Sequence, residues 1–172
     1  AAVQRIDVVL AFQPIRVGQH LIITPTWAEP DTGPDDIVIR LDPGPAFGTG
    51  GHPSTRLTLR LLERYVHIGD HVLDVGTGSG ILAIAAIKLG AAAVHATDND
   101  PIAVRVAAEN LTLNDVADRV SLETGSVPGA GHYEIVVANI LADVIAELLL
   151  DEGLADRVAG RGTLLLAGII RH

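Results

Sequence analysis

Apolar and polar positions alternate in two different ways along this chain. From Pro53 onward, short apolar runs typical of buried strands are separated by segments whose apolar residues recur every three or four positions, as on one face of a helix. The expected helices are a segment that follows Pro53, then Ile81–Leu89, Pro101–Leu113 and Asp143–Val158, the last with a break at Gly153. The expected strands are His71–Val75, Ala93–Thr97, Arg119–Glu123, Glu134–Ala138 and Thr163–Ala167. This order is typical of repeated βαβ units and predicts an α/β fold with a doubly wound, mostly parallel sheet.

The first 52 residues follow a different pattern. They contain six of the nine prolines, and their apolar runs are short. Two strands are expected there, His20–Thr24 and Ile37–Leu41, separated by a loop rich in Pro, Asp and Gly. We therefore divide the chain into a region of short strands and linker over 1–52 and an α/β core over 53–172.

Composition narrows the class of protein. A hydrophobic content of 48% over 172 residues argues against disorder and for one folded domain. Cysteine is absent, and the seven histidines are scattered without metal-ligand spacing, so no metal site is expected. The formal charge of -9 disfavours a nucleic-acid partner and favours a basic protein or a cationic small molecule. The chain has no apolar run long enough to span a bilayer and no signal-peptide pattern, so we expect a cytoplasmic protein. It also lacks methionine, even at position 1, which indicates processing or a piece of a longer chain.

A glycine-rich turn joins the first core strand to the helix that follows it. Residues 72–80, VLDVGTGSG, place Gly76, Gly78 and Gly80 at alternate positions. Glycines allow positive φ angles and let a ligand approach the backbone without meeting a Cβ atom. In an open parallel sheet such a turn lies beside the crevice where ligands bind. A tight turn without a ligand is the alternative, and three glycines in this arrangement disfavour it.

The turn matches neither of two common nucleotide-binding motifs. A P-loop needs Gly-Lys followed by Ser or Thr, and the single lysine of the chain is Lys88. The dinucleotide motif G-x-G-x-x-G has its third glycine one residue later than Gly80, where this chain has Ile81. Asp74, two residues before the first glycine, suits a ligand that carries an ammonium and a sulfonium group. We therefore favour S-adenosylmethionine over NAD or a nucleoside triphosphate.

Two polar residues follow later core strands. Asp98 comes 22 residues after Gly76, where a carboxylate can accept hydrogen bonds from both ribose hydroxyls. It can alternatively cap the next helix, but Asp100 can serve as that cap. Asn139 comes just past the fourth expected strand, where its carbonyl can accept a hydrogen bond from an amine that attacks a methyl group. Capping of the following helix is an equally good interpretation of Asn139.

Several segments resemble one known family, in the same order along the chain. These segments are residues 41–55 (LDPGPAFGTGGHPST), 72–87, 98–101 (DNDP) and 138–142 (ANILA), with weaker similarity at 12–18 and 25–27. They are similar to the methyltransferases that modify protein eleven of the large ribosomal subunit. The resemblance covers the chain from about residue 12 onward. It implies a Rossmann-like class I core, S-adenosyl-L-methionine as the cofactor, and N-methylation of amino groups on a ribosomal protein.

The resemblance also implies roles for single residues. Thr55, Gly76, Asp98 and Asn139 match cofactor-contacting positions of the family, and Asn139 would orient the acceptor nitrogen. The loop from Phe47 to Thr55 would fold over the cofactor, held by Thr55. From the residues themselves, we expect Gly76, Gly78 and Gly80 to allow close backbone approach. Asp74 would either contact the amino-acid end of the cofactor or fix the geometry of the turn.

The chain departs from the family pattern in several places. Gly51 stands where the family usually has threonine, and Ser126 where many class I methyltransferases have an acid that contacts adenine. His52 is expected to be structural rather than catalytic. Residues 1–11 cannot supply the family's substrate-docking domain, and the final helix and antiparallel strand pair are missing. A methyltransferase for another protein or a small molecule, and a cofactor-binding fragment without activity, therefore stay open as alternatives.

Overall fold

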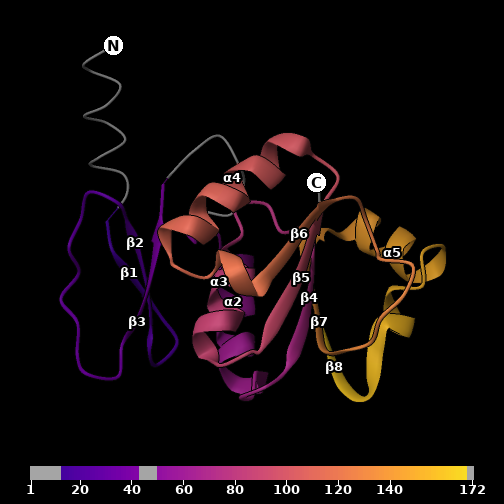
Figure 1. Cartoon of the computed structure of the whole chain (residues 1–172), viewed down its shortest axis with the longest axis horizontal. Coiled ribbons are helices and arrows are strands. Elements are labelled where there is room, and N and C mark those ends of the chain that lie inside the picture. Colours follow the sequence, from indigo (N-terminus) through magenta and orange to yellow (C-terminus); the bar gives the residue numbers. More distant parts are fainter. Residues whose placement is uncertain (1–12, 43–49, 170–172) are drawn as a thin grey trace.

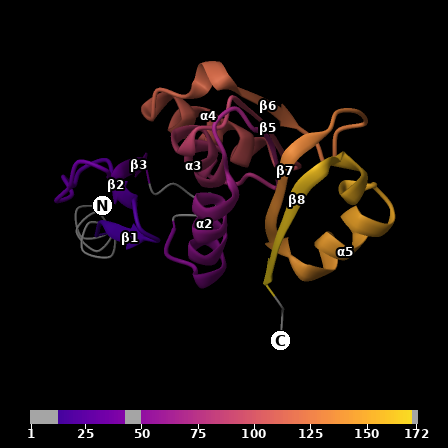
Figure 2. The ribbon, with the colours of Figure 1, turned by 90° about the horizontal axis from the view of Figure 1, so that it is seen from below.

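The computed structural model describes residues 13–42 and 50–169, which form a small three-stranded sheet and a larger five-stranded sheet (Figure 1). The helices are α2 (Pro53–Tyr65), α3 (Ile81–Leu89), α4 (Pro101–Leu113) and α5 (Ala142–Leu150). Figure 2 shows α2, α3 and α4 on one face of the larger sheet and α5 on the other. Helix α2 lies between the small sheet and the larger one in both views.

All neighbouring strands of the larger sheet are parallel. The strands are β4 (His71–Val75), β5 (Ala93–Asp98), β6 (Val120–Thr124), β7 (Tyr133–Leu141) and β8 (Val158–Ile169). Their order is β6-β5-β4-β7-β8, so the chain runs outward from β4 to β6 and then returns to the other side of β4. This confirms the prediction of a doubly wound parallel sheet. The direction reverses between β4 and β7, and in such sheets ligands bind outside the carboxyl ends of the strands at this point.

The small sheet has the order β1-β2-β3. Its strands are β1 (Ile15–Val17), β2 (Leu21–Pro25) and β3 (Ile37–Leu41). Strand β2 is antiparallel to β1 and parallel to β3. The two strands expected in this region are confirmed, whereas β1 was not predicted because its three residues are too few to show a period.

The helices begin and end where local chemistry directs them. Helix α4 has Pro101 in its first turn, and Oδ1 of Asp100 accepts a hydrogen bond from the Ile102 N–H at 2.8 Å, as predicted. Helix α3 is buried from Ile81 to Ile87 and ends at Leu89, and its C-cap Gly90 has a left-handed φ of 119°. Helix α2 is capped by His52, whose Nδ1 accepts a hydrogen bond from the Ser54 N–H, so the structural role expected for this histidine is confirmed.

One hydrophobic core joins the two sheets. Val17, Leu21 and Ile39 of the small sheet are fully buried in the same cluster as Leu59 and Leu62 of α2. A second cluster lies on the other face of the larger sheet, under α5 and the short 3-10 helix η2 (Leu154–Arg157). Burial of large aliphatic side chains on this scale supplies the main free energy of folding.

The predicted helix over Asp143–Val158 is wrong in its second half. Helix α5 ends at Leu150, Gly153 adopts a left-handed φ of 67°, and Val158 already belongs to β8. The predicted break at Gly153 is confirmed, but α5 has already ended before it, and Gly153 instead precedes the short 3-10 helix η2. Strands β7 and β8 are also longer than predicted, because they pair with one another over most of their length.

Three further predictions concern a membrane span, a metal site and the cofactor-covering loop. Within residues 13–42 and 50–169, no helix is long and apolar enough to cross a bilayer. In the same part of the chain, no group of three or more His, Asp or Glu side chains is arranged to hold a metal ion. The predicted cofactor-covering loop from Phe47 to Thr55 lies partly outside the described residues, which resume at Gly50.

Candidate functional site

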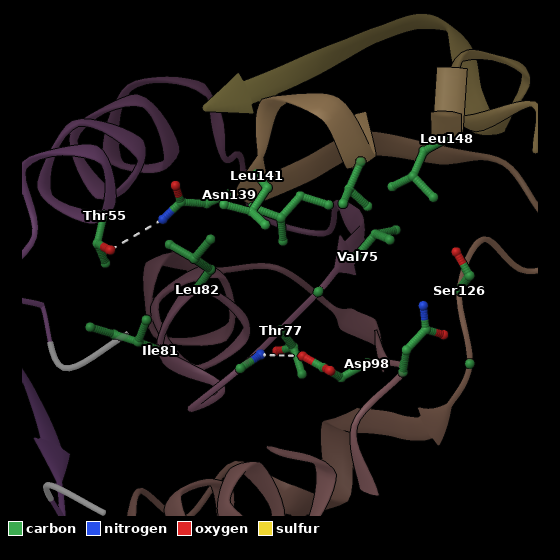
Figure 3. A pocket seen from close by; sticks show the side chains of 16 residues that line it. Thr55, Val75, Thr77, Ile81, Leu82, Asp98, Ser126, Asn139, Leu141 and Leu148 are labelled. Atoms are coloured by element: carbon green, nitrogen blue, oxygen red, sulfur yellow. Dashed lines mark hydrogen bonds between the residues drawn. The ribbon is translucent and has the colours of Figure 1, made fainter. Parts of the chain in front are cut away.

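A cavity of about 390 Å³ opens at the carboxyl ends of β4, β5 and β7 (Figure 3). This is the position that the strand order indicates for a ligand. The cavity is lined by Thr55, Val75, Gly76, Thr77, Gly78, Ile81, Leu82, Asp98, Asn99, Gly125, Ser126, Asn139, Ile140, Leu141, Val144 and Leu148. Five of the seven site residues predicted from the sequence are in this set: Thr55, Gly76, Gly78, Asp98 and Asn139.

Residues Gly76, Thr77 and Gly78 of the glycine-rich turn line the cavity. Gly76 and Gly78 have φ angles of 74° and 56°, which favour glycine. A Cβ atom on Gly76 would also collide with Cγ2 of Ile140. The N–H groups of Gly76 and Thr77 both donate to the Thr97 carbonyl, at 2.8 and 2.9 Å. These two bonds fix the start of the turn to the end of β5.

Asp98 lies at the end of β5 and faces the turn. Its Oδ2 accepts a hydrogen bond from the Gly78 N–H at 2.9 Å, and its Oδ1 accepts one from the Asp100 N–H at 2.9 Å. Since Asp100 caps α4, the division of roles between the two acids is confirmed on the Asp100 side. Contact of Asp98 with a ribose stays a prediction.

Asn139 and Thr55 meet at the opposite end of the cavity, although they are 84 residues apart in the sequence. Nδ2 of Asn139 donates to Oγ1 of Thr55 at 3.1 Å, as the dashed line in Figure 3 shows. Oδ1 of Asn139 is buried and has no hydrogen-bond partner among the described residues. Asn139 lies inside β7 rather than past its end, and no side chain caps α5. The alternative role as a helix cap is therefore wrong.

Asp74 and Gly80 do not line the cavity. Asp74 is fully buried beneath the turn, where its Oδ2 accepts a hydrogen bond from Oγ1 of Thr77 at 2.7 Å. Of its two predicted roles, the structure therefore favours the geometry of the turn over contact with a ligand. Gly80 is the N-cap that directly precedes α3, and a Cβ atom there would lie 3.3 Å from Cβ of Ala107. Its lack of a side chain thus serves the packing of α3 on α4, not the approach of a ligand.

Burial perturbs the ionisation of Asp74. It is the largest cause of a rise in the pKa of Asp74 to about 7, the hydrogen bond from Thr77 opposes the rise, and the charge of Asp98 adds to it. Oδ1 of Asp74 has no hydrogen-bond partner among the described residues, and the Ala83 N–H, like the hydroxyl of Thr77, favours the charged form of the carboxyl group.

The rest of the lining is largely apolar, and much of it was not predicted. Val144 and Leu148 come from α5, while Asn99, Gly125 and Ser126 follow the ends of β5 and β6. The sequence already marks Ser126 as the position where many class I methyltransferases have an adenine-contacting acid. Asn99 and Gly125 could have been found from the strand order, but the lining residues from α5 have no local sequence signal. Among the described lining residues, Asp98 is the one that carries a formal charge. Such a lining suits a cationic ligand with an apolar ring system and offers no cation to a phosphate.

Comparison with known proteins gives one consistent result. A sequence profile of the family described as "Ribosomal protein L11 methyltransferase (PrmA)" matches residues 7–172. The chain belongs to this family. The resemblance noted in the sequence is thereby confirmed.

Several relatives share its sequence or fold. The ribosomal protein L11 methyltransferase of Pelobacter propionicus is 51% identical over 165 residues, covering 92% of this chain and 53% of the relative. That of Exiguobacterium sp. is 48% identical over 161 residues, with coverage of 92% and 51%. The crystal structure of ribosomal protein L11 methylase from Lactobacillus delbrueckii subsp. bulgaricus matches with a TM-score of 0.83 and 38% identity, covering 92% of this chain and 81% of that one. The chain spans about half the length of the curated relatives it matches.

Proposed function

We propose that residues 53–172 form the cofactor-binding core of an S-adenosylmethionine-dependent N-methyltransferase, and that its substrate is an amino group of ribosomal protein L11. The observation that carries the proposal is the meeting of three separate elements around one cavity: the glycine turn after β4, Asp98 at the end of β5, and the pair of Asn139 and Thr55. Membership of the ribosomal protein L11 methyltransferase family supports the choice of substrate.

The residues of the cavity fit this cofactor. Asp98 supplies carboxylate oxygens for ribose hydroxyls, and each oxygen retains acceptor capacity beyond the one N–H that it now binds. Gly76 and Gly78 line the cavity without side chains and so permit close approach to the backbone, and Val144 and Leu148 offer apolar surface to a ring. A positively charged sulfonium is compatible with a lining whose one formal charge is negative.

The bound cofactor supplies an activated methyl group, so the main task of the protein is to place the acceptor nitrogen in line with it. The buried Oδ1 of Asn139 has no protein partner among the described residues and can accept a hydrogen bond from that nitrogen. Its bond to Thr55 holds the amide in one orientation. The apolar surroundings favour the neutral amine over the ammonium ion, and only the neutral form can attack.

The charge of the chain agrees with a basic partner. With 21 acidic and 12 basic side chains, the chain has a formal charge of -9, which attracts a cationic substrate and repels nucleic acid. We infer direct recognition of the protein substrate, with no nucleic-acid or membrane partner, and a cytoplasmic location where ribosomal proteins are made.

Calorimetric titration with S-adenosylhomocysteine tests the cofactor site. We expect Asp98→Ala to weaken binding by about tenfold to a hundredfold, because a charge-assisted hydrogen bond contributes about 1.5–3 kcal/mol. Asp100→Ala is the matched control: Asp100 caps α4 but does not line the cavity, so its loss should leave the affinity unchanged. Absence of binding by the wild-type chain, or equal affinity of Asp98→Ala, would refute the assignment.

A second assay tests the reaction. Labelled methyl transfer should be measured with purified ribosomal protein L11, with other ribosomal proteins and with a panel of amine metabolites. Transfer to L11 alone supports the proposal, and transfer to another acceptor supports a different methyltransferase. Binding of S-adenosylhomocysteine without any transfer would identify a cofactor-binding fragment.

A further inference from the structure

Asn110 of α4 and Asn114, the C-cap that directly follows this helix, are both buried on the side that faces β3. Asn110 and Asn114 are 2% and 6% exposed and lie one helical turn apart. A buried amide group is costly unless its donors and acceptor are hydrogen-bonded. Both side chains meet this condition, but they do so with different partners.

Asn114 is bonded to the small sheet and to its own helix. Its Oδ1 accepts a hydrogen bond from the Arg40 N–H at 2.9 Å, and its Nδ2 donates to the Arg40 carbonyl at 2.6 Å and to the Asn110 carbonyl at 2.8 Å. Strand β3 is the last strand of its sheet, so the amide of Asn114 pairs with it as a neighbouring strand would. These contacts account for Asn114 as a purely structural residue.

Asn110 instead joins the small sheet to the ligand cavity. Its Oδ1 accepts a hydrogen bond from the Asp42 N–H, just past the end of β3, at 3.2 Å. Its Nδ2 donates to the Ser79 carbonyl at 2.9 Å. Ser79 belongs to the glycine-rich turn and directly follows Gly78, which lines the cavity. One side chain therefore connects two segments that are separated by 36 residues in the sequence.

A turn with three glycines needs outside restraints to hold one conformation, because glycine loses more conformational freedom on folding than any other residue. The N–H groups of the turn are held from the strand side, by the Thr97 carbonyl and by Asp98. Asn110 holds a carbonyl of the same turn from the helix side. The turn is thus fixed between β5 and α4.

We propose that Asn110 is a positioning residue for the cofactor cavity, which holds the glycine-rich turn against the end of β3 in the conformation that binds the cofactor. This inference rests on the proposed function, because S-adenosylhomocysteine serves as the probe ligand for the cavity. A preorganised turn binds more tightly because less ordering remains to be done on binding. Asn110 itself does not touch the cavity, so its effect passes through Ser79 and Gly78.

The test compares Asn110→Ala with Asn114→Ala in the full chain. Both variants lose a buried amide that is hydrogen-bonded to backbone at or just past β3, and we expect similar decreases of the melting temperature. Calorimetry at 10 °C, with folding verified by circular dichroism, should show about tenfold weaker binding of S-adenosylhomocysteine for Asn110→Ala, the effect of about one lost hydrogen bond. Asn114→Ala should bind with the affinity of the wild type.

Asn110→Asp separates the two bonds of the side chain. The carboxylate keeps an acceptor for the Asp42 N–H but places an oxygen opposite the Ser79 carbonyl, so its affinity should fall at least as far as that of Asn110→Ala. If Asn110→Ala does not fold, Asn110→Ser, which keeps a small polar side chain, takes its place in the same comparison. Wild-type affinity in the folded Asn110 variants, or an equal loss in Asn114→Ala, would overturn the proposal.

A readout without ligand separates this proposal from the proposed function. Hydrogen–deuterium exchange of residues 76–80 should be faster in Asn110→Ala than in Asn114→Ala, whether or not S-adenosylhomocysteine binds. If the wild type fails to bind the probe, the proposed function fails, while faster exchange in Asn110→Ala alone still supports the positioning role. Equal exchange in the two variants would refute that role.

Discussion

Replacement of Asp74 by asparagine should change how the stability of the protein depends on pH. Asp74 is fully buried, and burial raises its pKa from 3.8 to about 7. One unit of difference between the folded and unfolded pKa corresponds to about 1.4 kcal/mol, so the full shift corresponds to about 4 kcal/mol. Asparagine has nearly the same shape, keeps an oxygen for the hydroxyl of Thr77 and carries no charge at any pH.

The direction follows from the number of bound protons. Between the two pKa values the folded chain retains a proton on Asp74 that the unfolded chain has lost. The free energy of unfolding of the wild type therefore falls as the pH rises from about 4 to 7 on account of this group, and the loss is complete above pH 7. Asp74→Asn lacks this loss. The unfolding free energy of the variant minus that of the wild type should therefore be greater at pH 8 than at pH 5, by about 3 kcal/mol.

Urea unfolding followed by circular dichroism at pH 5, 6, 7 and 8 measures the effect. Asp35→Asn is the control, because it removes the same charge from an exposed loop of the small sheet and should run parallel to the wild type. The reasoning is wrong if the difference in unfolding free energy between Asp74→Asn and the wild type stays constant across this range.

Three further substitutions test the cavity. Gly76→Ala should lower both the melting temperature and the affinity for S-adenosylhomocysteine. The added methyl group would collide with Ile140, and the φ of 74° disfavours a side chain. An unchanged melting temperature and an unchanged affinity by calorimetry would contradict the observed turn geometry. Asn139→Ala should slow methyl transfer by about a hundredfold while weakening cofactor binding much less, as expected for loss of a group that orients the acceptor. Thr55→Val, which removes only the hydroxyl bonded to Asn139, should slow transfer less in the same labelled-methyl assay.

The sequence predicts the central elements closely because several signals agree there. Strand β4 and helices α3 and α4 have the predicted bounds, since an apolar run, a glycine or proline and a capping residue indicate the same boundaries. The region after α5 has no such agreement. Leu154 and Val158 continue the helical period of apolar residues past Leu150, but Val158 pairs with β7 and therefore belongs to β8.

The candidate site divides in a similar way. Residues at the carboxyl end of a parallel strand, such as Asp98 at the end of β5, could be placed from the topology alone. Asp74 could not, because Val72 to Val75 are buried on both faces of the sheet and the alternation that normally tells one face from the other is lost. Asn110 gave no signal, since a polar residue on a helix usually faces solvent, and only the partners contributed by Ser79 and Asp42 explain its burial.

The core that the small sheet shares with α2 has a consequence for how the molecule melts. Because Val17, Leu21 and Ile39 pack without intervening solvent against Leu59 and Leu62, neither sheet has an interior of its own on this side. The two sheets should lose their structure in one cooperative step. A cavity-forming substitution at Val17, Leu21 or Ile39 would then reduce the fraction of molecules able to bind the proposed cofactor, although none of these three residues lines the cavity.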